Sequence, residues 1–550
     1  MKKIKFSLLV ICLLLGFSCE QEVITTQPPD PCTIDPDSCL PNPEPGSANF
    51  SKYVAIGTSI SAGFQAGALF TDGQNESLGA ILGKQFAKVN DDDDFDQPSI
   101  NSANGFNSTF SNIGAGVIRG RLILFDPDGA GPRSAGPSPS GAQASSVTCP
   151  SNVSTPAVPE PYNSADIPAA FTGNKTALNN FSVPGIIAYQ LTQAGTGNPA
   201  HPLYNGLYAR FASNPGVSTI LGDAVAAAPT FFTLEIGYNE VLGYATKGGT
   251  GTDPATAPYD PATFSAVIGG VFAAMPGGSK GAISTVPDVT KLPYFSLVKW
   301  NPIPMDAATV AVVNPAFAGY NQVLDALKGP PFNYSAADVD ARKVNFTVSK
   351  TNPAVIIDET LNDYGDEFDI LQGAGAITAE QRAALVPYEQ IRQTTSSDKM
   401  TLSAGSVLGT CVSNNPQLIN GVSVPLADQY VLIPSEITTI RDAVAGYNNA
   451  INTLVTNNPT RLAKADLYTA YENWIAAPGA TILSNGYPVT AGIAPPLAAF
   501  SEDGVHPNGK GTAVFANVFI DAINAAFGST INKANVTKYK GTRTPVYPAP

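Results

Sequence analysis

Two side chains at opposite ends of the chain are of the types needed for nucleophilic catalysis. Ser59 follows the apolar run Tyr53–Ile56 and Gly57, which places it at the carboxyl end of a predicted buried strand. In open α/β sheets, ligands bind at that edge. A nucleophilic serine needs a base to take its proton, and the chain of 550 residues holds only two histidines, His201 and His506.

His506 has the sequence context expected of that base. Asp503 precedes it by three positions, and such an acidic side chain can fix the tautomer of an imidazole and stabilise its charged form. Pro507 follows and biases His506 toward extended backbone, which suits a projecting loop. Two alternatives stay open: Asp503 could instead cap the helix that follows, and His201, between two prolines, fits an ordinary surface loop.

Four segments resemble, in the same order, the sequence blocks of the SGNH (GDSL-type) hydrolase superfamily. They are Gly57–Gly63, Asn180–Gly185, Gly237–Glu240 and Asp503–Pro507, and the resemblance extends over roughly residues 50 to 527. Residues 231–249 and 281–295 also look like a group of large bacterial members. Such a set of motifs needs the matching structural context before it carries an assignment.

The resemblance implies a role for each matching residue. Ser59 would be the nucleophile, His506 the base and Asp503 the residue that orients His506. The backbone N–H groups of Ser59 and Gly185 and the side-chain amide of Asn239 would form the oxyanion hole, in which each donor is typically worth about 10²–10³ in rate. Taken alone, Gly185 is equally a turn residue after a proline, and Asn239 could merely bridge a loop.

The chain departs from the family pattern at two positions. Thr58 stands where the family usually has Asp, and Glu240 stands where Asp is usual. Neither residue is the expected nucleophile, base or oxyanion donor. Activity is therefore still expected, and the two departures would affect its rate. Thr58 can still hydrogen-bond locally but carries no charge, so the sequence predicts a working but slower enzyme. Restoring the acid in Thr58→Asp is therefore not expected to lower kcat/KM.

The N-terminus has the pattern of a secretory signal. A charged start, an apolar run from Phe6 to Phe17 and Ser18 precede Cys19, and the run is too short to cross about 30 Å of hydrocarbon. Residues 1–18 are therefore expected to be a signal peptide. Cys19 resembles the lipidated first residue of bacterial lipoproteins, which implies a lipid anchor in the cell envelope, at the outer membrane. Plain cleavage and an uncleaved anchor are the alternatives.

Four cysteines remain after the signal and the lipidation site: Cys32, Cys39, Cys149 and Cys411. An even number in an oxidising compartment favours disulfides. The preferred pairing is Cys32 with Cys39 and Cys149 with Cys411, one of three possible connectivities. Structural metal is the alternative, but no two of these cysteines have Cys-x-x-Cys spacing.

Composition excludes some classes of partner. The formal charge is −14, which disfavours nucleic acid because that ligand rewards a basic face. There is no phosphate-binding loop motif and no metal-binding constellation, so no cofactor and no metal are expected. The acidic run at residues 91–94, with Asp96, could bind calcium, although a solvated loop is the more ordinary explanation of a charge run.

Strand and helix patterns alternate along the chain. Expected strands are 52–56, 181–183, 230–236, 281–286 and 462–467, and helices are expected near 77–89, 264–272, 435–455 and 512–523, with Ser435 as the N-cap of the third. This alternation predicts an α/β fold with a mostly parallel sheet between two helix layers. The SGNH resemblance implies the same flavodoxin-like, three-layer α/β/α architecture.

The expected organisation is one hydrolase domain with additions. Residues 19–48, rich in proline and acidic residues, would form a tether, residues 49–530 the SGNH hydrolase domain, and residues 531–550 a tail. Such a core needs only about 200 residues, so residues 87–175 and 296–430 are read as large loop insertions. Residues 126–170 are expected to lack regular structure. Substrate choice is expected to lie in the insertions.

The expected function is hydrolysis of carboxylic esters through an acyl-enzyme, by a membrane-anchored serine esterase or lipase. Its partners would be a lipid or acylated-glycan ester and the membrane, and the sequence does not separate these two substrate classes. The alternative from another class is a non-catalytic surface lipoprotein that binds glycan or lipid in the same cleft.

Overall fold

The central sheet has four strands that all run parallel. Their order is β1 (Tyr53–Gly57), β6 (Phe231–Glu235), β7 (Lys280–Ser284) and β14 (Leu462–Ala465). The computed structural model describes residues 39–90, 95–109, 111–113, 116–124, 157–161, 166–251 and 257–543. The chain divides into Met1–Pro41 and Asn42–Pro550, and everything below concerns the second unit.

A fifth extended segment lies along the free edge of β1. Ala55 N–H donates to Asn179 O at 2.7 Å, and Phe181 and Val183 N–H donate to Ala55 O and Gly57 O at 2.9 and 3.0 Å. The predicted strand at 181–183 is thus an isolated bridge rather than a regular strand. Counting this segment, the order in chain numbering is 2-1-3-4-5, that of flavodoxin-like folds, whose ligands bind where the order reverses, between β1 and β6 here.

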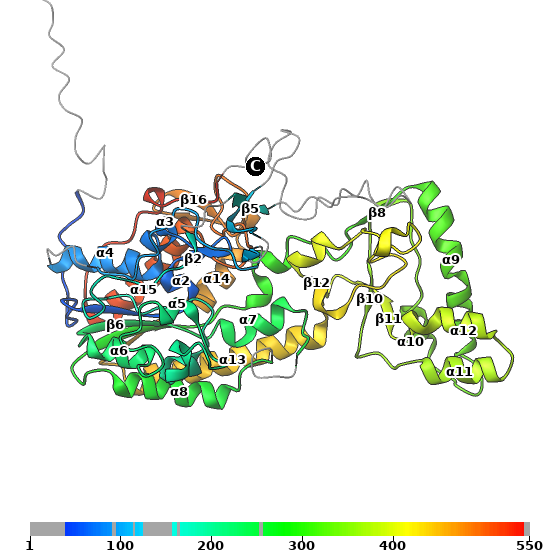
Figure 1. Ribbon diagram of the computed structural model, residues 1–550, viewed down its shortest axis with the longest axis horizontal. Coiled ribbons are helices and arrows are strands. Elements are labelled where there is room, and N and C mark those ends of the chain that lie inside the picture. Colours follow the sequence, from blue (N-terminus) through cyan, green and yellow to red (C-terminus); the bar gives the residue numbers. More distant parts are fainter. Residues whose placement is uncertain are drawn as a thin grey trace, which may run out of the picture. The chain divides into compact units, whose positions relative to one another are not determined.

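Helices cover both faces of the sheet (Figure 1). One layer contains α4 (Leu78–Asn90) and α15 (Gly509–Phe527), and the other contains α8 (Pro261–Ala274) and α13 (Pro434–Asn457). The predicted three-layer α/β/α fold is confirmed. The predicted N-cap of α13 is wrong: the cap is Ile433, because Pro434 occupies the first helical position and the Glu436 carboxylate accepts the Ile433 N–H at 2.7 Å.

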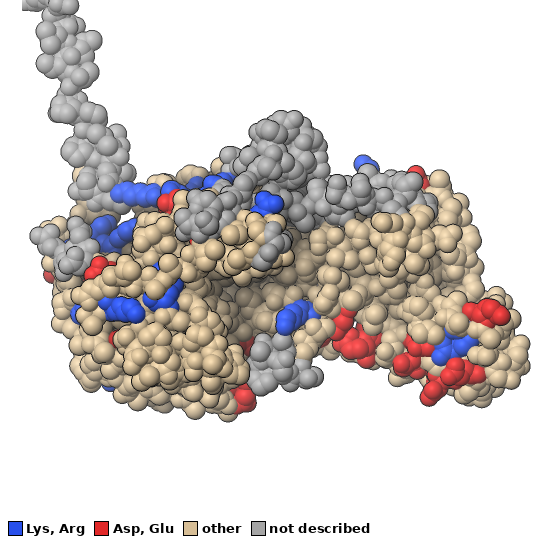
Figure 2. All heavy atoms as spheres, in the orientation of Figure 1, with Lys and Arg blue, Asp and Glu red and all other residues tan. Residues whose placement is uncertain are grey.

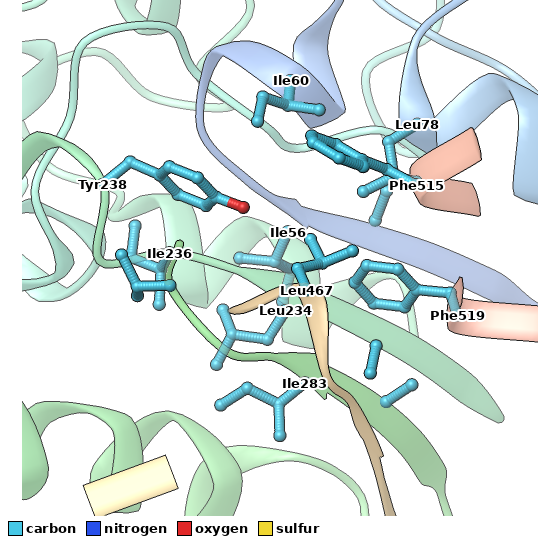
Figure 3. Packing of buried hydrophobic residues seen from close by; sticks show 14 of the residues in the cluster. Ile56, Ile60, Leu78, Leu234, Ile236, Tyr238, Ile283, Leu467, Phe515 and Phe519 are labelled. Carbon is cyan, nitrogen blue, oxygen red and sulfur yellow. The ribbon is translucent and has the colours of Figure 1, made fainter. Parts of the chain in front are cut away.

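The core lies between the sheet and these helices. Figure 3 shows Ile56, Leu234 and Ile283, from three adjacent strands, packed together with Phe515 and Phe519 of α15 close by. All five side chains are at most 3% exposed. The near-continuous apolar strands therefore bury both of their faces, as strands of a covered parallel sheet do.

The remaining elements are shorter or belong to insertions. They are β2 (Phe64–Gln65), β3 (Ala68–Leu69), α2 (Ser59–Ala62), α3 (Thr71–Asn75), β4 (Arg119–Leu124), β5 (Ala157–Pro161), α5 (Gly206–Ala209), α6 (Ile220–Ala226), α7 (Asn239–Thr246), β8 (Ile303–Met305), α9 (Ala307–Ala326), α10 (Ala336–Ala341), β9 (Ser349–Asn352), β10 (Val355–Ile357), α11 (Gly365–Gly373), α12 (Ala379–Leu385), β11 (Ile391–Gln393), β12 (Lys399–Met400), β13 (Val431–Leu432), α14 (Leu467–Ala476), β15 (Thr481–Ser484) and β16 (Tyr487–Thr490).

The two predicted insertions contain regular structure. Residues 298–433 have a hydrophobic core of their own, separate from that of the sheet, and are called the insertion lobe below. Within the first insertion, β4 and β5 form an antiparallel hairpin, so the expectation of no regular element at 126–170 is wrong for Ala157–Pro161. Both insertions are therefore more than surface loops.

The first and last described segments of this unit pack onto its body. Ser47 N–H donates to Phe527 O at 2.8 Å, and the Asn517 side chain bonds both backbone groups of Ala534 at 2.7 and 3.0 Å. Residues 42–48 and 531–543, expected to belong to the tether and the tail, thus contact the fold. Within the described ranges, no helix combines the length and apolar character that crossing a membrane requires.

Several predictions fall outside the described residues. These are the signal peptide 1–18, lipidation at Cys19, most of the tether and the acidic run at 91–94. Cys32 and Cys149 also fall outside, so the pairings with Cys39 and Cys411 stay predictions.

Candidate active site

Ser59 sits on a sharp turn between the first strand and a one-turn helix. β1 ends at Gly57, α2 begins at Ser59, and Gly63 ends α2 with φ +85°. A Cβ at position 57 would lie 2.7 Å from Ser61 Oγ and 2.9 Å from Glu235 O. Glycine is therefore needed at position 57 for the turn to close against β6.

A buried carboxylate accepts three hydrogen bonds from this turn. Glu235, the last residue of β6, accepts the Thr58 N–H at 3.0 Å, the Thr58 hydroxyl at 2.7 Å and the Ser61 N–H at 3.2 Å. Burial raises the pKa of Glu235 to about 7, against the lowering effect of the bonds from Thr58 and Ser61. We call this set of three hydrogen bonds the Glu235 brace.

Sequence reasoning missed Glu235. The only available signal was an acidic residue near the end of the otherwise apolar run at 231–236. Charged side chains are almost never fully buried unless they are paired, and the predicted strand was expected to be buried. That carboxylate therefore required a polar partner, which the sequence did not identify because Thr58 is 177 positions away.

The predicted acid–base pair is present. Asp503 Oδ2 lies 2.8 Å from His506 Nδ1, and Asp503 Oδ1 also accepts the backbone N–H groups of Val505 and His506, each at 2.9 Å. Burial alone would raise the pKa of Asp503, but the charge of His506 and these bonds outweigh it and lower the pKa to about 2. Asp503 therefore stays ionised and fixes the ring orientation.

The open alternative for Asp503, a helix cap, is wrong. Asn508 caps α15, because its side-chain oxygen accepts the Gly511 N–H at 3.1 Å. The Asn508 amide also donates to Ala498 O at 2.9 Å and Phe500 O at 3.2 Å. Asn508 thus joins the start of α15 to residues 498–500. Residues 501–507, which lie between them and include His506, are called the histidine loop below.

The hairpin β2–β3, next along the chain after Ser59, contacts the histidine loop. Gly67 N–H donates to Asp503 Oδ2 at 3.0 Å, and Ala66 N–H donates to Ser501 Oγ at 2.9 Å. The ring of Phe64 packs edge-on against His506 at 5.1 Å between centroids. The hairpin that follows the first motif therefore contacts the last motif across more than 430 positions of sequence.

Asn239 donates one amide hydrogen to a backbone carbonyl, and no described residue accepts the second. It is the first residue of α7, and its Nδ2 donates to Ile186 O at 2.8 Å. A side-chain amide carries two N–H donors. The bond to Ile186 orients the group, and the second hydrogen can serve a ligand.

Gly185 adopts φ +78°, and a Cβ there would touch nothing within 4 Å. The backbone conformation, rather than crowding, is what favours glycine. No described residue accepts a hydrogen bond from the exposed Gly185 N–H. Next to this segment, Glu240 Oε1 accepts the Ala188 N–H at 2.5 Å, so the residue that departs from the family pattern ties α7 to the Gly185 loop.

Two cavities meet at these residues. The serine pocket, of about 30 Å³, and the larger tyrosine cleft, of about 930 Å³, share Asn239, Leu242, Val505 and His506. The serine pocket is also lined by Thr58, Ser59, Ile60, Tyr238, Pro287, Val289, Leu292, Tyr471, Phe500, Pro507 and Phe515. The tyrosine cleft is also lined by Gly185, Ile187, Tyr189, Gln190, Pro202, Leu203, Tyr204, Asn205, Glu240, Gly243, Tyr244, Thr246, Ala257 and Tyr259.

The structure thus brings the predicted site residues to one place. Ser59, Asn239 and His506 line the serine pocket, Gly185 lines the adjoining cleft, and Asp503 binds His506. In the described part of the chain no hydrogen bond joins the Ser59 hydroxyl to His506. Catalytic bonds of this kind often tighten only when substrate is bound.

The other histidine and the acidic groups lie elsewhere. His201 is exposed, as predicted, and its Nδ1 accepts the Leu203 N–H at 3.1 Å. Among the described residues, Glu359, Asp428 and Glu436 form a group whose carboxylate oxygens lie within 4.8 Å of one another. None of the three lines the serine pocket or the tyrosine cleft.

Comparisons with protein-family models, with curated proteins and with solved structures found no match to this chain.

Proposed function

We propose that this protein is a serine esterase of the SGNH type, which hydrolyses carboxylic esters through an acyl-enzyme. One observation carries the proposal: Ser59, Asn239 and His506, which come from three separate motifs, line one pocket, and Asp503 holds the His506 ring at 2.8 Å. The pocket lies at the carboxyl ends of β1 and β6, where the strand order reverses and ligands are expected.

The chemistry follows from the placement of these groups. Ser59 Oγ attacks the ester carbonyl carbon while His506 Nε2 takes the hydroxyl proton. The C–O bond to the alcohol then breaks, and His506 returns the proton to the leaving oxygen. In the second half, His506 takes a proton from water, which attacks the acyl carbon. The bond from that carbon to Ser59 Oγ then breaks, His506 returns the proton to Ser59 Oγ, and the carboxylic acid leaves. Asp503 stabilises the imidazolium in both halves of the reaction.

The negative charge that develops on the carbonyl oxygen needs donors. The free N–H of the Asn239 amide and the backbone N–H groups of Gly185 and Ser59 would supply them. Such donors stabilise the transition state because they are already oriented before the charge forms. The bond from Asn239 to Ile186 and the bond from Ala188 to Glu240 preorganise two of the contributing segments.

The location of the enzyme is part of the same proposal. Cleavage before Cys19 and lipidation of that residue would anchor the enzyme in a bacterial cell envelope, at the outer membrane. An oxidising compartment is also where disulfides among Cys32, Cys39, Cys149 and Cys411 would persist. The SGNH assignment rests on the four ordered segments and on the flavodoxin-like strand order.

Turnover of p-nitrophenyl acetate tests the proposal. We expect hydrolysis by the wild type and a loss of at least about 10³-fold in kcat for Ser59→Ala and for His506→Ala. His201→Ala is the matched control, because it removes the other, exposed histidine and should leave kcat unchanged. A folded wild-type protein that binds a glycan or a lipid but hydrolyses no ester would support the non-catalytic alternative instead.

A further inference from the structure

The two cavities at Ser59 differ in size and in chemistry. The serine pocket has a volume of about 30 Å³, whereas the tyrosine cleft has about 930 Å³. A single water needs about 10–15 Å³ on this measure, and small-molecule sites range over about 300–1,000 Å³. The serine pocket therefore has room for about two or three water-sized groups, whereas the tyrosine cleft has room for a large one.

The walls of the serine pocket cannot easily move apart. Val289, Phe500 and Phe515 are at most 3% exposed, and Ile60 and Leu292 are at most 8% exposed. All five belong to the main hydrophobic core. Because cores are packed about as densely as organic crystals, widening the pocket for a long chain would cost packing contacts throughout this region.

The tyrosine cleft has a different lining. Four tyrosines contribute to it, and two of them, Tyr189 and Tyr204, are 39% and 43% exposed. Of the described residues that line it, only Glu240 and His506 are ionisable within the physiological range, and Glu240 is 2% exposed with its carboxylate bonded to Ala188. The described lining thus offers exposed aromatic faces and no lysine or arginine that would pair with an anionic head group.

We propose that the substrates are neutral carbohydrates bearing short acyl esters of acetyl size, with the acyl group in the serine pocket and the sugar rings in the tyrosine cleft. This inference rests on the proposed function. Sugar rings present apolar C–H faces that stack on aromatic rings, and tyrosines can pack through the ring while the hydroxyl stays hydrated. With the acyl group in the serine pocket, a lipase would require a pocket much longer than the one that these apolar side chains leave.

A chain-length series tests the acyl side. We expect kcat/KM on p-nitrophenyl acetate to exceed that on the octanoate by at least about 100-fold, and the palmitate to be inert. That factor corresponds to about 2.7 kcal/mol, a cost comparable to overpacking a core. Leu292→Ala should shift the preference toward butyrate. Equal or higher kcat/KM on the octanoate or palmitate, or faster hydrolysis of phosphatidylcholine vesicles, would overturn the inference.

Acetate release from glucose pentaacetate, acetylated xylan and acetylated glucomannan tests the sugar side. We expect release from at least one of them. Tyr189→Ala and Tyr204→Ala should each lower kcat/KM on that substrate about tenfold more than on p-nitrophenyl acetate, as loss of a stacking contact would. Tyr468→Ala is the matched control, since Tyr468 is 38% exposed on α14 and lines neither cavity.

The outcomes separate the two proposals. Hydrolysis of p-nitrophenyl acetate without release from any of the three carbohydrates contradicts the substrate class and leaves the esterase standing. Absence of p-nitrophenyl acetate hydrolysis contradicts both. Equal losses on both kinds of substrate for the two tyrosine variants would also overturn the placement of the sugar in the tyrosine cleft.

Discussion

At the scale of single residues, the Glu235 brace gives Thr58 a structural role, although the SGNH pattern that the chain resembles usually has Asp at this position. Thr58 donates both its N–H and its hydroxyl to Glu235, so a carboxylate is present at the turn but is supplied by β6. An acid at position 58 would face that carboxylate directly. The sequence could not show this because the two residues are 177 positions apart, and the expectation for Thr58→Asp is accordingly reversed.

We therefore predict that Thr58→Asp lowers kcat/KM at pH 8 by at least about tenfold, because two carboxylates in contact cannot both ionise without displacing the turn. Thr58→Ser is the matched control and should stay near the wild type, since it keeps both donors. The double variant Thr58→Asp/Glu235→Gln should recover most of the loss. Undiminished kcat/KM in Thr58→Asp would show that the brace does not position Ser59.

A second residue-scale prediction concerns Asp503. Its pKa of about 2 in the folded state lies below its ordinary value of 3.8. The stabilisation is therefore complete above about pH 4 and disappears as the pH falls through 2. The difference between these two pKa values corresponds to roughly 2 kcal/mol.

Asp503→Asn should lose this stabilisation together with the charge that supports the imidazolium. We expect kcat to fall by about 10³–10⁴. In urea unfolding, the difference in free energy of unfolding between wild type and variant should be largest at pH 7 and should shrink below pH 4. A difference that stays constant down to pH 2.5 would mean that the folded-state pKa is not depressed.

At the scale of elements, three short segments position the histidine relative to the serine. The hairpin β2–β3 contacts the histidine loop from the side of the serine turn, and the Asn508 cap fixes the loop to the start of α15. Buried hydrogen bonds to Ala498 and Phe500 extend this attachment. We infer that the position of His506 depends on Asn508 although Asn508 does not touch the substrate pocket.

We predict that Asn508→Ala lowers the free energy of unfolding by about 2–4 kcal/mol, the sum of a lost cap and of buried acceptors left without donors, and also lowers kcat. Asp306→Ala is the control: Asp306 caps α9 in the insertion lobe by accepting the Thr309 N–H at 2.8 Å, and it lines neither the serine pocket nor the tyrosine cleft. It should cost only about 1 kcal/mol and leave kcat unchanged. Equal kcat in the two variants would show that Asn508 does not position His506.

The elements that could be predicted from sequence are those whose pattern is local. The apolar periodicity of α4, α8, α13 and α15 and the apolar runs of β1, β6 and β7 placed them within a few residues of their observed bounds. The cap of α13 was misplaced because Pro434 can itself start a helix. The bridge at Asn180 and the hairpin β4–β5 depend on partners far away in sequence, which local patterns do not reveal.

The candidate site divides in the same way. Ser59, His506, Asp503, Gly185 and Asn239 were found because each lies in a short motif. Glu235 and the hairpin contacts of Gly67 were not, because their roles depend on partners 177 and 436 positions away in the sequence. The insertion lobe was likewise not foreseen as a unit with its own core, since its buried residues come from many short elements between 298 and 433.

At the scale of the whole molecule, the acidic composition is distributed unevenly. On the face shown in Figure 2, acidic side chains gather over α11 and α12 of the insertion lobe. Other carboxyl groups are withdrawn from water, and burial raises the pKa of Glu235, Glu240, Asp428 and Glu502 to about 7 and that of Glu436 to about 8. The formal charge of −14 counts every carboxyl group as ionised. Near neutrality the folded protein is therefore less negative than this value.

This predicts that the protein is more stable at pH 5.5 than at pH 8.5. In the folded state these carboxyls have raised pKa values, so between about pH 4.5 and 8 the folded chain binds more protons than the unfolded chain, and stability falls as the pH rises. Differential scanning calorimetry should give a higher Tm at pH 5.5. Glu436→Gln should reduce the difference, whereas a Tm that rises with pH across this window would contradict the raised pKa values.

The most direct test of the central claim is a covalent one. Wild-type protein treated with a fluorophosphonate should gain one adduct, and peptide mass spectrometry should place it on Ser59. Labelling should disappear in Ser59→Ala and slow strongly in His506→Ala, while Ser182→Ala should label as the wild type does. An adduct on another residue, or folded wild-type protein that never labels, would contradict the assignment of Ser59 as an activated nucleophile.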